Sequence, residues 1–155
     1  MKGIRKDPRH RAREAALQVL YQWDVGRTDV GSAADTFFDL QWADAEPPND
    51  ELRTFATELA HDTIRRLAES DALIAETAER WRPERMAVID RLILRMAVTE
   101  LLRAQGRSGS NDVTPPAVVI NEALELARTF STEEAVKFIN GILDTIRRKL
   151  ESAVV

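Results

Sequence analysis

The sequence predicts an all-α fold, a single compact domain spanning residues 1–155 and built around a buried central helix at residues 86–103. Three observations support this prediction. From Met86 to Leu102, apolar residues occupy most of the circumference of a helix, and a helix that is apolar nearly all round is buried. Elsewhere apolar residues recur at helical spacing, and no segment alternates as a strand would. A chain of this length can bury roughly two thirds of its unfolded surface in one core.

The central helix carries one narrow polar stripe. Arg91, Arg95, Thr99 and Arg103 recur at every fourth position, so they lie on one face, which we expect to reach water. Charges this frequent exclude a membrane span, and the basic N-terminal segment lacks the apolar run expected of a signal peptide. The chain has no cysteine and therefore no disulfide framework. A soluble, cytoplasmic protein without a membrane partner is expected.

About seven helices are expected, and their ends follow from capping signals. Asp7 and Pro8 are typical of a helix start, and Gly26 closes the first helix as a residue that tolerates positive φ. Ser32 and Ser70 are expected to cap the second and fourth helices, and Ser131 forms a capping box with Glu134. The expected helices cover residues 8–25, 32–43, 50–69, 71–80, 86–103, 117–129 and 131–150.

Charge is distributed unevenly along the chain. The formal net charge is -4, but the first thirteen residues contain six arginine and lysine residues and a single acid, Asp7. Residues 1–7 are therefore expected to form a basic N-terminal arm. The overall charge of -4 argues against a protein that coats nucleic acid, whereas a basic arm on an acidic body indicates a functional asymmetry.

Catalytic chemistry is poorly represented. His10 and His61 are far apart in sequence, and no phosphate-binding glycine loop or metal-binding histidine motif is present. The glutamates have the spacing of charged helix faces. We therefore expect no enzyme activity, no metal site and no cofactor.

Binding chemistry is better represented on the first helix. Its arginines can contact phosphates, and Gln18 and Tyr21 on the same exposed face add an amide and a ring on which a base can stack. This combination is typical of single-stranded RNA binding. The residues alone equally allow a solvated basic tail followed by an ordinary amphipathic helix.

A second candidate segment lies at residues 137–141, with the sequence KFING. Gly141 costs about 1 kcal/mol relative to alanine inside a helix, so it requires either close helix packing or close approach of a ligand. Asn140 beside it offers both a donor and an acceptor. On spacing alone, packing is the favoured explanation.

Three ordered segments resemble the NusB family of bacterial transcription antitermination factors. They are RHRAREAALQVLYQWDVG from Arg9, IDRLILRMAVTELL from Ile89 and AVVINEALELARTFSTEEAVKFINGILDTI from Ala117. The resemblance implies two packed helical bundles and no catalysis. It also implies binding to the boxA element of ribosomal RNA transcripts, with ribosomal protein S10, other Nus factors and RNA polymerase as partners.

The resemblance also implies roles for individual residues. The RNA-binding residues that it implies are Arg9, Arg11, Arg13, Gln18, Tyr21, Lys137, Phe138 and Asn140. His10 stands where the family commonly has arginine, which puts that phosphate contact in doubt. For the S10 surface the resemblance points to the fourth and central helices, and Asp90 is the acid expected there.

We expect the first and last helices to form one RNA track, so that Arg11 and Lys137 lie on the same side of the molecule. Two other functions stay open. One is a detached targeting module like the NusB-like domains fused to RNA cytosine methyltransferases. The other is a helical protein-protein adaptor without specific RNA binding. Some family members form homodimers, and the sequence leaves this open here.

Overall fold

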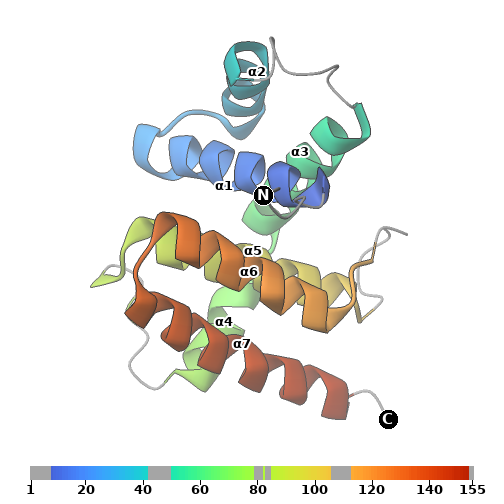
Figure 1. Ribbon diagram of the computed structural model, residues 1–155, viewed down its shortest axis with the longest axis vertical. Coiled ribbons are helices and arrows are strands. Elements are labelled where there is room, and N and C mark those ends of the chain that lie inside the picture. The colour runs from blue at the N-terminus through green and yellow to red at the C-terminus, as the bar shows by residue number, and fades with distance from the viewer. Residues whose placement is uncertain (1–7, 42–49, 79–81, 83–84, 106–112, 154–155) are drawn as a thin grey trace, which may run out of the picture. The chain divides into compact units, whose positions relative to one another are not determined.

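The computed structural model describes residues 8–41, 50–78, 82, 85–105 and 113–153 (Figure 1). These residues form seven α-helices and no strand, which confirms the all-α prediction. The expected basic arm at residues 1–7 lies outside the described residues, as do the ends predicted at residues 43 and 80. The helices are α1 (Pro8–Gly26), α2 (Val30–Gln41), α3 (Asp50–Arg65), α4 (Leu67–Thr77), α5 (Val88–Arg103), α6 (Pro116–Phe130) and α7 (Glu133–Ala153).

The chain divides into two compact units, Met1–Asp62 and Thr63–Val155. Unit 1 contains α1, α2 and most of α3, and unit 2 contains α4 to α7. Each unit is described by itself below. That the whole chain acts as one domain stays a prediction.

In unit 1, α1 packs against α2. Ala12, Ala16 and Leu20 are fully buried on one face of α1, as their spacing predicts, and Phe38 contributes a buried ring from α2. Small and large apolar side chains thus fill the core of unit 1 together.

The end of α1 differs from the expected geometry. Gly26 is still helical, and the residue with positive φ is Arg27, at 55°. The prediction that Gly26 carries the left-handed conformation is therefore wrong by one residue. The amide of Thr28 donates a hydrogen bond to the Gln22 carbonyl at 3.4 Å. This bond ends the helix and places the turn at Arg27.

We expect Arg27→Gly to raise the free energy of unfolding by about 0.5–1 kcal/mol, because a left-handed backbone is strained for a residue with a Cβ and not for glycine. Urea unfolding followed by circular dichroism measures this change. The matched control is Arg11→Gly inside α1, which should lower stability by about 1 kcal/mol. Destabilisation by both substitutions would contradict the assignment of strain to Arg27.

The start of α2 is capped by Asp29 and not by Ser32. The Asp29 carboxylate accepts a hydrogen bond from the Ser32 amide at 3.2 Å, and its carbonyl accepts one from Ala33 at 2.8 Å. Ser32 therefore lies inside the first turn. Aspartate and serine are nearly equivalent at an N-cap, so the sequence pattern alone cannot choose between them.

In unit 2, α5 is the buried central helix that the sequence predicts, and α4, α6 and α7 all pack on it (Figure 1). It begins at Val88, two residues later than expected. Its fully buried side chains include Leu92, Ile93, Leu94, Leu101 and Leu102.

The polar stripe of α5 is partly exposed at Arg91 and Arg95 but buried at Thr99 and Arg103, so the expectation that it reaches water is wrong for its second half. Thr99 and Arg103 are buried, and the Thr99 hydroxyl donates to the Arg95 carbonyl. Arg95 donates two hydrogen bonds to the Asp71 carboxylate of α4, at 2.9 and 2.8 Å. A planar guanidinium matches a carboxylate in this two-bond geometry, so the stripe serves as a helix-helix contact.

The break between α3 and α4 also falls earlier than predicted. Arg66 interrupts the helix, and Ser70 lies inside α4, fully buried, with no hydrogen-bond partner for its hydroxyl among the described residues. The prediction that Ser70 caps the fourth helix is therefore wrong. An interior serine of this kind fills space in a packed face.

The start of α7 is capped by Thr132, whose hydroxyl accepts a hydrogen bond from the Ala135 amide at 3.0 Å. The predicted Ser131 capping box is wrong, because the Ser131 hydroxyl donates instead to Asp90 of α5. A tertiary contact thus decides which of two adjacent hydroxyl residues caps the helix.

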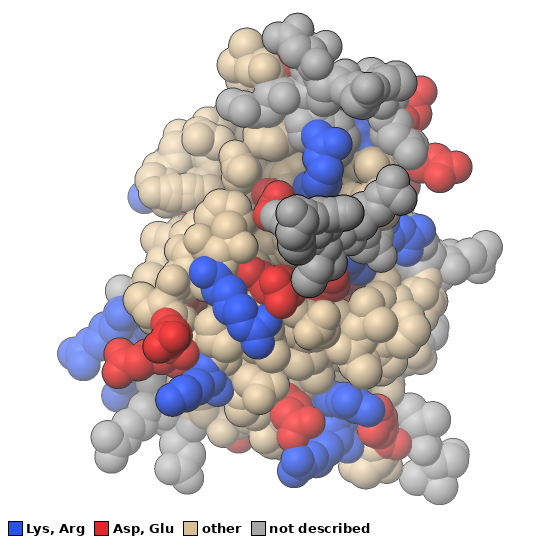
Figure 2. Space-filling model, in the orientation of Figure 1, with Lys and Arg blue, Asp and Glu red and all other residues tan. Residues whose placement is uncertain are grey.

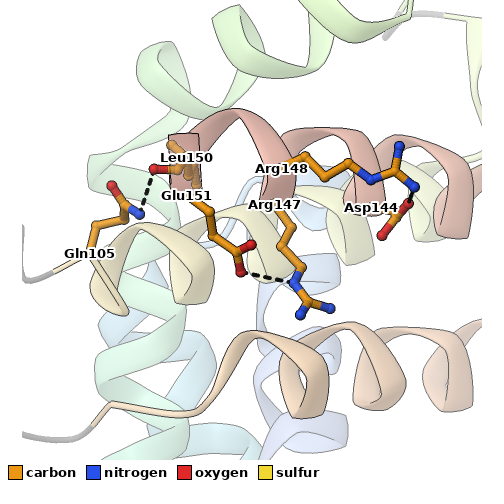
Figure 3. A network of polar contacts seen from close by, with 6 residues as sticks. All are labelled: Gln105, Asp144, Arg147, Arg148, Leu150 and Glu151. Atoms are coloured by element: carbon orange, nitrogen blue, oxygen red, sulfur yellow. Dashed lines mark hydrogen bonds and ion pairs between the residues drawn. The ribbon is translucent and has the colours of Figure 1, made fainter. Parts of the chain in front are cut away.

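The last turns of α7 are held by polar contacts that Figure 3 shows. Gln105, at the end of α5, donates to the Leu150 carbonyl at 2.9 Å. Arg147 and Glu151 pair along the helix at 3.0 Å, and Arg148 pairs with Asp144. None of the helices in the described part of the chain is both long enough and apolar enough to cross a membrane.

Candidate nucleic-acid interface

Two arginines of α1 stack on one aromatic ring in unit 1. The guanidinium carbons of Arg9 and Arg13 lie 4.7 and 5.1 Å from the centroid of Phe55, which belongs to α3. Arg13 is 3% exposed, whereas Arg9 is half-buried. A cation over a desolvated ring gains about 2 kcal/mol. The stacking fixes the first turns of α1 against α3 and favours a positioning role for Arg13 over direct contact with a ligand.

Arg11 is the exposed arginine of this turn. Its neighbour His10 is buried, with Nε2 3.2 Å from a carboxylate oxygen of Glu14 one turn further along α1. Glu14, which shares the exposed face expected for RNA, is therefore engaged with His10. Among the three arginines predicted to bind RNA, Arg11 is the exposed one, and its contact with a phosphate stays a prediction.

Gln18 and Tyr21 lie on the exposed face of α1, two to three turns beyond Arg11. Tyr21 is 36% exposed, so a large part of the side chain is accessible while the rest packs on the helix. An exposed aromatic ring beside an amide can stack a base and contact its edge.

In unit 2, three predicted site residues lie together on the first turns of α7. Lys137 and Asn140 are exposed, and Phe138 is 43% exposed, while Ile139 between them is fully buried. Because Ile139 fixes the rotation of α7 in the core, its neighbours must point outward. The motif therefore presents a cation, a ring and an amide to solvent.

Gly141 follows this motif and faces open space. A Cβ built at this position meets nothing within 4 Å among the described residues. Close packing inside unit 2, the favoured explanation from spacing alone, is therefore wrong. The other explanation, the close approach of a ligand to the backbone of α7, stays a prediction.

Gly141→Ala separates folding from binding. We expect this substitution to raise the free energy of unfolding by about 0.5–1 kcal/mol, since alanine is the better helix former and no atom opposes its Cβ. If a ligand approaches the backbone here, RNA affinity should fall several-fold in the same variant. Thermal unfolding and RNA titration on one preparation measure both. A gain in stability without loss of affinity would contradict the ligand explanation.

Asp90, the acid expected to contact a protein partner, lies half-buried at the start of α5 and accepts a hydrogen bond from Ser131. It therefore joins α5 to the residue that precedes α7. The structure gives Asp90 an internal role, and its contact with a partner stays a prediction.

Basic side chains are interspersed with acidic ones on one face of the molecule. Figure 2 shows Lys and Arg side chains of this face lying beside Asp and Glu side chains, with uncharged surface between these groups. Arg11 belongs to unit 1 and Lys137 to unit 2, so the expected common track across both stays a prediction.

One contributor that sequence reasoning missed is Phe55. Phe55 is a buried residue of α3, and its pairing with Arg9 and Arg13 depends on a contact between residues about forty positions apart. The sequence signal for this stacking is the spacing of Arg9 and Arg13, four residues apart on one helix. That spacing does not identify the ring on which they stack.

The helices and their exposed side chains define an all-helical binding protein whose candidate site consists of arginine, lysine, amide and aromatic residues. The chain belongs to the NusB family, whose family model matches residues 10–148. Membership places it among transcription antitermination factors.

Individual proteins extend this match over nearly the whole chain. The transcription antitermination protein NusB of Solibacter usitatus is 44% identical over 142 residues, which cover 92% of this chain and 90% of that protein. A crystal structure of T. maritima NusB is 32% identical, covers 94% of both chains and has a TM-score of 0.76. A crystal structure of the antitermination factors NusB and NusE in complex with dsRNA is 25% identical, covers 92% of this chain and 97% of that one, and has a TM-score of 0.76.

Proposed function

We propose that this protein binds the boxA element of ribosomal RNA transcripts as a single strand, together with ribosomal protein S10, and joins the RNA polymerase antitermination complex with other Nus factors. The observation that supports this most strongly is the coincidence of family membership with exposed Arg11, Gln18 and Tyr21 on α1. The protein acts by binding in the cytoplasm, without a chemical step.

The exposed side chains divide the work of RNA recognition. Arg11 and Lys137 hold phosphates, which gives affinity without sequence information. Tyr21 and Phe138 offer rings on which bases stack, and Gln18 and Asn140 offer amides to base edges. Arg9 contributes a half-buried cation, and Arg13 holds the helix start in place through Phe55.

A solved relative supports both partners. The structure of NusB with NusE, which is S10, contains dsRNA. For this chain we assign the S10 contact to the surface of α4 and α5, with Asp90 at its edge. The bidentate pair between Asp71 and Arg95 holds these two helices in register, so that they can present one surface.

Filter binding with boxA RNA and a scrambled RNA of equal length tests the proposal, with and without purified S10. We expect a preference for boxA of at least tenfold with S10, and weaker binding to a boxA duplex than to the single strand. Equal binding of boxA and scrambled RNA, with retained binding of S10, would contradict it and would favour the adaptor alternative.

A further inference from the structure

A pocket of about 390 Å³ opens between α1 and α2 in unit 1. Gln18 and Gln22 line it from α1, and Thr36, Phe37 and Leu40 line it from α2. Its volume lies within the range of small-molecule sites, roughly 300–1,000 Å³. Only Gln18 among these residues was singled out from the sequence.

The lining of this pocket is uncharged and offers free hydrogen-bonding groups. In the described part of the chain, the side chains of Gln18, Gln22 and Thr36 make no hydrogen bond, although amides and hydroxyls can both donate and accept. The ring of Phe37 is half-buried and packs edge-on against Phe38, with centroids 5.3 Å apart, so its position is fixed. A planar, polar-edged and neutral ligand fits this chemistry.

The pocket lies on the same side of α1 as the predicted phosphate contact. Gln18 and Gln22 follow Arg11 by seven and eleven residues, so each of the two side chains lies within roughly 20° of Arg11 around the helix. Gln18 is about 10 Å from Arg11 along the axis. A strand held at Arg11 can therefore extend along α1 to the mouth of the pocket.

Acidic residues next to the lining residues of α2 in sequence disfavour a phosphate at the pocket. Asp35 and Asp39 are exposed on α2, and Asp35 pairs with Arg53 at 3.5 Å. Phosphates would be repelled here, whereas a neutral base would not. The arrangement separates a phosphate site at the start of α1 from a base site further along it.

We propose that this pocket receives one unstacked nucleobase of the bound RNA, with Gln18 and Gln22 hydrogen-bonding its edge and Phe37 contacting its ring. The inference rests on the proposed RNA-binding function and adds Gln22, Thr36 and Phe37 to the residues that determine sequence preference. A base read by two amides is discriminated from the wrong base by its donor and acceptor pattern.

The test combines protein variants with abasic RNA. A boxA oligonucleotide is prepared with a single abasic nucleotide at each position in turn, and each is titrated against the full-length protein, Gln22→Ala and Thr36→Phe, which fills the pocket. We expect one abasic position to weaken binding of the unaltered protein about tenfold. Each variant should weaken binding of intact RNA five- to tenfold, yet bind that abasic RNA no more weakly than the unaltered protein does.

The control is Thr54→Ala, an exposed neutral residue of α3 in the same unit, which should leave every affinity unchanged. Circular dichroism verifies folding of each variant. Two results would overturn the proposal that the pocket binds a base while leaving the proposed function intact. One is that the loss of affinity caused by a variant multiplies with the loss caused by the abasic position. The other is that the variants bind intact RNA normally. Thr36→Phe could instead abolish self-association or binding of a protein partner, with no abasic position at which its effect on RNA binding disappears. That result would overturn the proposal in favour of a protein as the occupant of the pocket. Failure of the unaltered protein to bind boxA would instead reject the proposed function.

Discussion

Asp71→Ala is expected to lower the free energy of unfolding by about 2–3 kcal/mol, with a fall in Tm of about 5–10 °C. The Asp71 carboxylate accepts both hydrogen bonds from Arg95, whose side chain is only 11% exposed. Removing the acid leaves a largely buried cation without its partner, and this costs more than a surface pair is worth. Differential scanning calorimetry measures the change.

The reciprocal variant sharpens this prediction. Arg95→Met keeps the aliphatic stem and leaves Asp71, which is 31% exposed and can be hydrated, so we expect a smaller cost of about 1 kcal/mol. Asp144→Ala is the matched control. It breaks a pair with Arg148, whose side chain is 75% exposed, and should cost less than about 0.5 kcal/mol. Equal losses for Asp71→Ala and Asp144→Ala would contradict a structural role for the α4–α5 pair.

Arg11→Ala and Asn140→Ala should weaken RNA binding in different ways. Arg11→Ala removes a phosphate contact, so affinity for boxA and scrambled RNA should fall together, and the slope of log affinity against log salt should flatten by roughly 0.7. Asn140→Ala removes an amide that reads a base edge, so the ratio of boxA to scrambled affinity should fall about tenfold with little change in slope. Salt-dependent filter binding measures both.

The control for the charge change is Arg148→Ala, an exposed arginine of α7 that is already paired with Asp144. It should leave the salt slope nearly unchanged. Equal loss of affinity with unchanged preference in both Arg11→Ala and Asn140→Ala would reject the division between phosphate holding and base reading.

The helical fold was predictable because its strongest signal is independent of tertiary detail. Leu92, Ile93 and Leu94 are consecutive and all buried, which in a helix requires neighbouring elements on most sides. The fate of the polar stripe was not predictable. The spacing of Arg95 and Thr99 predicts a solvent-exposed face. They are sheltered instead, because Asp71 of another helix supplies the hydrogen-bond partner that a largely buried arginine needs.

Helix ends were the weakest part of the prediction, for an energetic reason. Adjacent cap candidates differ by less than about 1 kcal/mol, so a single long-range contact decides between them. Asp90 takes the Ser131 hydroxyl and leaves Thr132 to cap α7. At the end of α1, the helix continues through Gly26 and the left-handed turn falls on Arg27.

The candidate site was predictable only where exposure follows from helical periodicity. Gln18, Tyr21 and Asn140 are exposed because their neighbours on the opposite faces form the core. Arg13 is buried by Phe55, and the pocket beside Gln22 depends on α2, so neither follows from the pattern of α1 alone.

The most direct measurement of the central claim is the NMR mapping of backbone amide shifts in the full chain as boxA RNA is added. The proposal predicts the largest shifts at Arg11, Gln18 and Tyr21 in unit 1 and at Lys137 and Asn140 in unit 2, saturating together at one RNA per protein. Two results would contradict a single transcript held by α1 and α7. One is that the amide shifts of both groups do not change, and the other is that they saturate at different RNA concentrations in the two units.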